Sequence, residues 1–198
     1  IQAEKITKDI NPTYGSVQKL FSRNTDLITF CEDRVIKILA NKDAIFNADG
    51  NPQLTANQNV LGQTIPFVGD YGISQNPESF ASESYRAYFA DKQRGAVLRL
   101  SMDGLTAISN DGMRDYFGEK LKNTTYIIGS YDNNKEEYNL TALYDDISVS
   151  NDSNITVSYD EKVKGWTSFK SFILENGCSV QNDYFTFKDG NLYKHHVE

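Results

Sequence analysis

Paired runs of alternating apolar and polar residues recur along the chain, and they constrain its fold more than any other feature. The runs are rich in β-branched and aromatic residues, and each pair is joined by a polar turn containing Asp, Asn or Gly. Period-two alternation bounded by such turn residues is the signature of a β-hairpin. The sequence therefore predicts about five antiparallel hairpins, at residues 26–39, 85–100, 126–143, 156–169 and 184–195.

Two short segments predict tight turns. Lys188-Asp189-Gly190-Asn191 contains the Asp-Gly pair, which adopts the positive φ values that a two-residue hairpin turn requires. Ser101-Met102-Asp103-Gly104-Leu105-Thr106 is similar to the Asp-box of sialidase-type propellers, but Gly follows Asp directly and Ala107 stands where that motif has Trp. We therefore interpret Asp103-Gly104 as a turn that links two strands.

Two longer stretches break the hairpin pattern. Residues 41–63 are rich in Asn, Asp and Gln and predict a long loop, a kind of segment that often forms interfaces. Residues 110–123 place Met113, Phe117 and Leu121 on one face at helical spacing, with basic residues in the last turn, so we expect one short helix there. A further helical turn is expected to start at Asn76, with Pro77 in its first position.

The predicted fold class is mainly β, built from antiparallel hairpins or meanders with one short helix insertion. The 12 Tyr and 11 Phe residues favour half-buried pleated surfaces. Hairpins of similar size suggest β-propeller-like blades, about two to three of them, and a β-sandwich is the alternative. The chain opens on Ile1 and stops directly after a strand-like run, so we expect residues 1–198 to be a piece of a longer structural protein.

Charge and hydropathy argue against two kinds of partner. The net charge is −7, and the 20 basic residues are interspersed with 27 acidic ones. A surface that grips phosphates needs clustered Lys and Arg, so we expect no direct sequence-specific binding of nucleic acid. No apolar run approaches the roughly 20 residues of a membrane-spanning helix, so we expect no membrane span.

The sequence assigns no catalytic, cofactor-binding or metal-binding residues. His195 and His196 are adjacent on a predicted strand, so their side chains point to opposite faces and do not readily share a metal. Residues 47–51 resemble the middle of a calcium loop, but the first and last ligand positions of such a loop fall on Ile45 and Ala56. Cys31 and Cys178 match no zinc spacing, and we expect two buried or half-buried thiols, with a disulfide left open.

Three stretches together resemble large virion structural proteins of tailed bacteriophages, including marine and crAss-like ones. The similarity covers roughly residues 25–198. Its segments lie at residues 65–81, 88–109 and 164–195, and include Ile65-Pro66-Phe67-Val68-Gly69-Asp70-Tyr71-Gly72, Arg94-Gly95-Ala96-Val97-Leu98-Arg99-Leu100-Ser101 and Lys164-Gly165-Trp166-Thr167-Ser168-Phe169.

The resemblance implies a non-enzymatic role in the virion, as a tail nozzle, muzzle or baseplate-associated component with propeller-like β structure. It implies assembly in the host cytoplasm and partners that are other virion proteins or further copies of the chain. It carries over no catalytic residue. In this reading Gly95 and Gly104 serve turns, and Trp166 and Phe169 serve packing.

A carbohydrate-binding or carbohydrate-active β module is the alternative function. Exposed aromatic side chains could stack on sugar rings, and Tyr71, Tyr85 and Trp166 are the candidates. The chain also contains many carboxylates, the groups that glycosidases use in pairs, but no local context selects any two of them.

Overall fold

The chain is mainly β, as the hairpin pattern predicts. The computed structural model describes residues 7–23, 26–39, 45–46, 52–53, 61–144 and 154–197. The chain divides into two compact units, Ile1–Gly72 and Ile73–Glu198. Each unit is built from antiparallel meanders, in which strands that follow one another along the chain pair side by side.

The first unit contains one four-stranded sheet with strand order β1-β2-β3-β6. The strands are β1 (Val17–Arg23), β2 (Asp26–Cys31), β3 (Val35–Leu39) and β6 (Thr64–Pro66), preceded by the 3-10 turn η1 (Pro12–Tyr14). Ile36, Ile38 and Cys31 form its buried cluster. Within the predicted 41–63 loop, β4 (Ile45–Phe46) pairs with β5 (Pro52–Gln53), and residues 41–44, 47–51 and 54–60 lie outside the described part of the chain.

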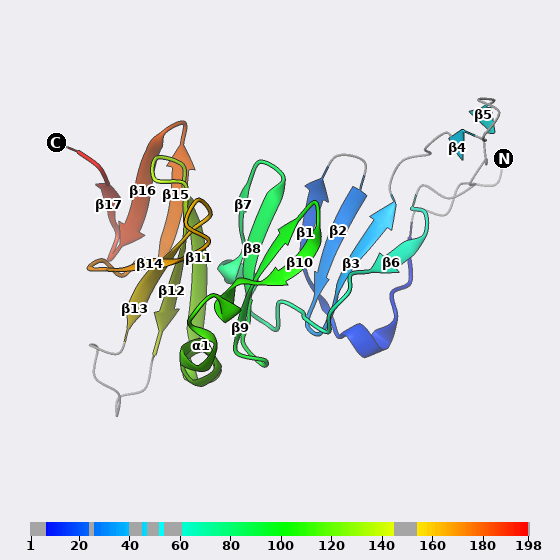
Figure 1. Ribbon diagram of the computed structural model, residues 1–198, viewed down its shortest axis with the longest axis horizontal. Helices are drawn as coiled ribbons and strands as arrows, with labels where there is room; N and C mark the ends of the chain where they lie inside the picture. Colours follow the sequence, from blue (N-terminus) through cyan, green and yellow to red (C-terminus); the bar gives the residue numbers. More distant parts are fainter. Residues whose placement is uncertain are drawn as a thin grey trace. The chain divides into compact units, whose positions relative to one another are not determined.

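The second unit contains three successive meanders (Figure 1). The first consists of β7 (Ala81–Glu83), β8 (Arg86–Asp91), β9 (Ala96–Ser101) and β10 (Gly104–Ala107). The second consists of β11 (Tyr126–Asp132), β12 (Glu137–Leu143), β13 (Ile155–Asp160) and β14 (Gly165–Lys170), and the third of β15 (Asn176–Val180), β16 (Asp183–Lys188) and β17 (Asn191–Lys194). The first strand of the second meander, β11, contacts both β7 and β15. Successive meanders whose first strands adjoin are compatible with propeller-like blades.

All five predicted hairpins are confirmed, and their tight turns have the expected backbone. The hairpins at 126–143 and 155–170 share one sheet, whereas the strands β1, β7 and β15, which the sequence did not predict, flank others. The turn at Asp103-Gly104 links two strands, β9 and β10, as predicted. Asp189 and Gly190 adopt φ values of 50° and 75°, as their turn requires. Gly104, with φ 104°, pairs with Ser101 across the turn between β9 and β10.

The predicted helix at 110–123 is shorter than expected. Only α1 (Arg114–Lys120) is α-helical, and it is flanked by the 3-10 turns η3 (Ile108–Asn110) and η4 (Leu121–Asn123). Phe117 and Leu121 are buried and Met113 packs against the same core, so the predicted apolar face is confirmed. The turn expected after Asn76 is the 3-10 turn η2 (Pro77–Ser79), in which the Asn76 side chain makes no capping hydrogen bond. None of the helices in the described part of the chain is long and apolar enough to cross a membrane.

The second meander has two buried faces of opposite chemistry. Strand register places Tyr131, Tyr138 and Tyr159 side by side on the face that belongs to the main core cluster. The neighbouring register row, Ser130, Asn139 and Ser158, is equally buried on the other face. The third meander covers this polar row, because the Ser130 and Tyr184 hydroxyls lie 2.7 Å apart. Hydrogen bonding between buried hydroxyls and amides makes such a polar face tolerable.

The third meander buries one face and exposes the other. Tyr184 and Thr186 point toward the second meander and are buried. Alternate residues therefore point the opposite way, and this side carries an apolar set that we call the outer apolar face: Cys178, Val180, Phe185, Phe187 and Leu192. The Lys194–Asp183 ion pair lies on the same side, with the Lys194 ammonium over the Phe185 ring. Val180 and Leu192 are each 59% exposed.

Candidate functional site

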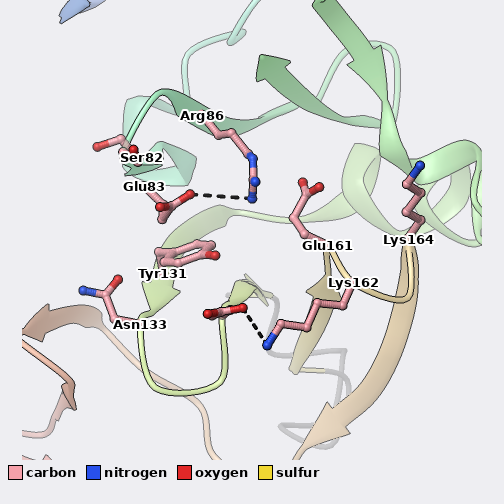
Figure 2. A pocket seen from close by; sticks show the side chains of 10 residues that line it. Ser82, Glu83, Arg86, Tyr131, Asn133, Glu161, Lys162 and Lys164 are labelled. Atoms are coloured by element: carbon pink, nitrogen blue, oxygen red, sulfur yellow. Dashed lines mark ion pairs between the residues drawn. The ribbon is translucent and has the colours of Figure 1, made fainter. Parts of the chain in front are cut away.

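A polar pocket of about 720 Å³ lies where three hairpin turns of the second unit converge (Figure 2). The region between β7 and β8 contributes Ser82, Glu83, Ser84 and Arg86. The region between β11 and β12 contributes Tyr131, Asn133 and Glu136, and the turn between β13 and β14 contributes Glu161, Lys162 and Lys164. The pocket is thus built by two adjacent meanders, and its volume suits a small ligand.

Each carboxylate of the pocket is paired with a cation. Arg86 lies 3.6 Å from Glu83, and Lys162 lies 2.6 Å from Glu136. The Glu161 carboxylate accepts hydrogen bonds from Arg99 at 2.8 Å and from the Tyr88 hydroxyl at 2.9 Å. Glycosidases use two carboxyl groups, one as an acid and the other as a base or nucleophile. In this pocket each of the three carboxylates has a cationic partner.

The Tyr131 ring that lines the pocket belongs to a stack of buried tyrosines. The Tyr88 ring stacks on Tyr138 at 4.9 Å and on Tyr131 at 5.7 Å between centroids. The Tyr138 hydroxyl donates a 2.7 Å hydrogen bond to the Ser79 carbonyl. Burial raises the pKa of Tyr88, and the Glu161 charge raises it further. Burial likewise raises the pKa of Tyr131, with a contribution from Glu83. Both phenols are therefore neutral hydrogen-bonding groups at physiological pH.

Two of the pocket turns share a backbone design with a third turn outside the pocket. Each starts with an aspartate whose carboxylate accepts backbone N–H bonds, and this residue is Asp91, Asp132 or Asp160. Four residues later the backbone takes a positive φ, which is 63° at Gly95, 59° at Glu136 and 53° at Lys164. A side chain in this left-handed region costs about 1–2 kcal/mol, which glycine avoids. Only the two pocket turns carry side chains there, and both side chains line the pocket.

The two histidines follow β17 instead of lying on it, so their predicted position on a strand is wrong by one or two residues. The ring nitrogen Nε2 of His195 lies 2.8 Å from the Thr186 hydroxyl, whereas that of His196 lies 2.7 Å from the Asp132 carboxylate. The two rings thus bind different partners. No group of three or more His, Cys, Asp and Glu side chains in the described ranges could hold a metal ion.

The cysteines differ from each other. Cys31 is buried, and burial, followed by the charge of Glu32, raises the pKa of its thiol. Cys178 is exposed, so the expectation that both thiols are at least half-buried is wrong for this residue. Both are free. Cys178 lies on an open sheet face, where the period-two pattern of its short strand exposes it.

The aromatic residues proposed to stack on sugars take different roles. Trp166 packs against Phe117 at 4.5 Å between ring centroids, and its indole N–H donates to the Ile108 carbonyl. Trp166 is therefore a packing residue. Tyr85 is exposed, with the Arg86 guanidinium 5.2 Å from its ring centroid, beside the pocket but not in its lining. Tyr71 belongs to the first unit. The calcium-like residues 47–51 lie outside the described ranges.

Sequence reasoning missed every residue that lines the pocket. Their types are common on any charged surface, and they come from three turns separated by dozens of residues. One local signal was available, namely the repeated spacing of four between an aspartate and the last turn residue, at 91–95, 132–136 and 160–164. Comparison with known proteins adds no assignment, since no protein-family model matches the chain and no curated protein matches it.

Alkaline pH is expected to destabilise the second unit. Burial raises the pKa of Tyr184 to about 12, whereas a tyrosine in the unfolded chain titrates near about 10. Below about pH 10 the phenol is neutral in both states and its full contribution is present. Between about pH 10 and pH 12 only the unfolded chain loses the proton, so the free energy of unfolding falls. Tyr88, Tyr131, Tyr138 and Tyr159 shift in the same direction.

Thermal unfolding followed by circular dichroism across this pH range checks the prediction. Tyr184→Phe is expected to reduce the loss of stability with rising pH, and replacement of the exposed Tyr126 by Phe is the matched control. A melting temperature that stays constant up to pH 12 would contradict the expected sign.

Proposed function

We propose that this chain is a non-enzymatic structural component of a phage virion, in its tail, nozzle or baseplate. It acts in particle assembly through contacts with other virion proteins or with copies of itself, and it is assembled in the host cytoplasm. The resemblance of residues 25–198 to such proteins suggests this role. The observation that best supports it is the outer apolar face of the third meander.

The outer apolar face supports a docking role because its side chains are exposed, whereas both faces of the second meander are covered. Both faces of the second meander are covered, one by the shared core with the first meander and one by the third. The third meander has three strands, whereas the other two in its unit have four. Among the described residues of the second unit, no strand pairs with the free edge of β17, and Val180 and Leu192 of the outer apolar face are exposed. Exposed apolar side chains mixed with an ion pair are typical of protein interfaces, and an open strand edge can pair with a further strand.

Leu192→Lys tests this role. Leu192 lies on β17 beside Phe187, so a lysine there places a charge in the proposed interface while remaining compatible with an exposed strand. We expect the variant to lose self-association or incorporation into virions, with an unchanged melting temperature. Light scattering of the full-length protein and electron microscopy of purified virions provide the readouts.

Met102→Lys is the matched control. Met102 is 67% exposed, but it lies in the turn between β9 and β10, away from the outer apolar face. This variant is expected to assemble normally. A wild-type protein that is strictly monomeric and absent from purified virions would overturn the proposal.

Carbohydrate binding is the second candidate function, and one observation favours it. The pocket of Figure 2 is polar, of suitable volume and rich in paired hydrogen-bonding groups. Trp166 does not contribute to it, so the site differs from the one that the exposed aromatic residues suggested. The charges of the pocket allow the ligand to be described further.

A further inference from the structure

The backbone keeps side chains at pocket positions where glycine would be favoured. Among the described residues, seven non-glycine residues have a positive φ, and three of them, Ser84, Glu136 and Lys164, line this one pocket. The equivalent position in the turn of the first meander is Gly95. Unfavourable backbone conformations that persist in one place are typical of binding sites. The pocket turns thus hold the Glu136 and Lys164 side chains in its lining, in a backbone conformation that glycine adopts at less cost.

Charge pairing leaves one cation over in this pocket. Its three carboxylates pair with Arg86, Lys162 and Arg99, of which Arg99 approaches Glu161 from beyond the lining. Lys164 lines the pocket too, and in the described part of the chain it makes no ion pair. A ligand with one negative charge would complete the pairing. The lining itself carries three carboxylates and three cations, and Lys164 is the lining cation that a ligand carboxylate can pair with.

The remaining lining groups suit hydroxyls better than apolar atoms. Tyr131 contributes the only ring of the lining, and its exposure is small. Carboxylates accept hydrogen bonds from hydroxyls, whereas guanidinium and amide N–H groups donate to them. Figure 2 shows Arg86 and Glu161 facing the interior between Asn133 on one side and Lys164 on the other. A compact ligand with several hydroxyls can use donors and acceptors of this kind together.

We propose that the pocket binds a sugar residue that carries a single carboxylate, such as a uronic acid. Lys164 receives the carboxylate. Arg86 and Asn133 donate to ring hydroxyls, and Glu161 accepts from one of them. The inference rests on the second candidate function, and its failure would leave the assembly role untouched.

Titration of the full chain with three probes tests the proposal. The probes are methyl β-D-glucuronide, the neutral methyl β-D-glucoside and acetate, with binding followed by NMR shift changes of the pocket residues. We expect the glucuronide to bind at least about tenfold more tightly than either other probe, because only it offers both a carboxylate and hydroxyls. Lys164→Gln is expected to weaken glucuronide binding by about tenfold and to leave glucoside binding unchanged.

Asp189→Gly is the matched control variant. Asp189 also has a side chain at positive φ, 50°, but it lies in the turn between β16 and β17, outside the pocket. Glycine removes the backbone cost at this position, and the variant is expected to bind all three probes as the wild type does. Equal binding of glucuronide and glucoside, or full binding by Lys164→Gln, would overturn the charge assignment but not sugar binding. Acetate binding as tight as glucuronide, or no sugar binding below about 10 mM, would overturn the sugar site itself.

Discussion

Replacing Gly129 by alanine is expected to lower the free energy of unfolding by about 3 kcal/mol or more. Gly129 lies in β11, where this strand packs against η2. A Cβ atom there would lie 1.9 Å from the Ser79 carbonyl oxygen and 2.9 Å from the Tyr138 hydroxyl. Ser79 is buried backbone that also accepts the Tyr138 hydrogen bond, so it cannot yield to the methyl group without separating β11 from η2.

Urea denaturation of Gly129→Ala and two control variants measures this effect. A Cβ at Gly165 meets no atom within 4 Å, so alanine there is expected to change stability little. Gly118 in α1 is equally open, and alanine there is expected to stabilise by about 0.5–1 kcal/mol through helix propensity. A free energy of unfolding for Gly129→Ala within about 1 kcal/mol of the wild-type value would contradict the close contact between β11 and η2.

Asp91→Ala is expected to destabilise the second unit by about 3 kcal/mol. The Asp91 side chain is 0% exposed. It forms an ion pair with Arg94 at 3.0 Å and accepts hydrogen bonds from the Arg94 backbone N–H and from the Ser74 hydroxyl. Removing the carboxylate leaves the Ser74 hydroxyl and the Arg94 backbone N–H without this acceptor. The cost of keeping these donors away from water is then no longer offset. The Arg94 guanidinium is a third exposed and can recover water, which keeps the loss at the lower end of the range for buried pairs.

Asp160→Ala separates the stability effect of a buried charge from the stability effect of capping a turn. Asp160 caps an equivalent turn by accepting the backbone N–H groups of Lys162 and Val163, but it is partly exposed. Its loss is expected to cost only about 1 kcal/mol. Chemical denaturation of the two variants side by side gives the comparison. Equal losses would mean that the turn, and not the buried charge, accounts for the effect of Asp91.

The strands that sequence analysis missed share a physical cause. β7 has only three residues, and β1 and β15 are largely exposed or half-exposed. Short or exposed strands carry no long apolar alternation, so the pattern that revealed the central hairpins is absent from them. The helix boundaries at 110–123 were wrong for a related reason. The apolar spacing of Met113, Phe117 and Leu121 is satisfied both by α-helix and by flanking 3-10 turns.

The polar face of the second meander shows a different limit. Ser130, Asn139 and Ser158 alternate with tyrosines, a pattern that predicts a solvent-facing side. In the structure these residues are buried, because the third meander covers them and its Tyr184 hydroxyl lies within hydrogen-bond distance of the Ser130 hydroxyl. The partner lies 54 residues from Ser130 along the chain, beyond any local pattern.

The sequence by itself determined the antiparallel hairpins, their Asp-Gly turns and the mainly β class, because alternation and turn chemistry act over a few neighbouring residues. Only the tertiary structure decided which polar residues are buried, which sheet face stays open and which charges share a pocket. Glu83, Asn133 and Glu161 meet because two meanders pack face to face and bring their turns to one place. That packing depends on the shapes of whole sheets, and no short segment of sequence specifies it.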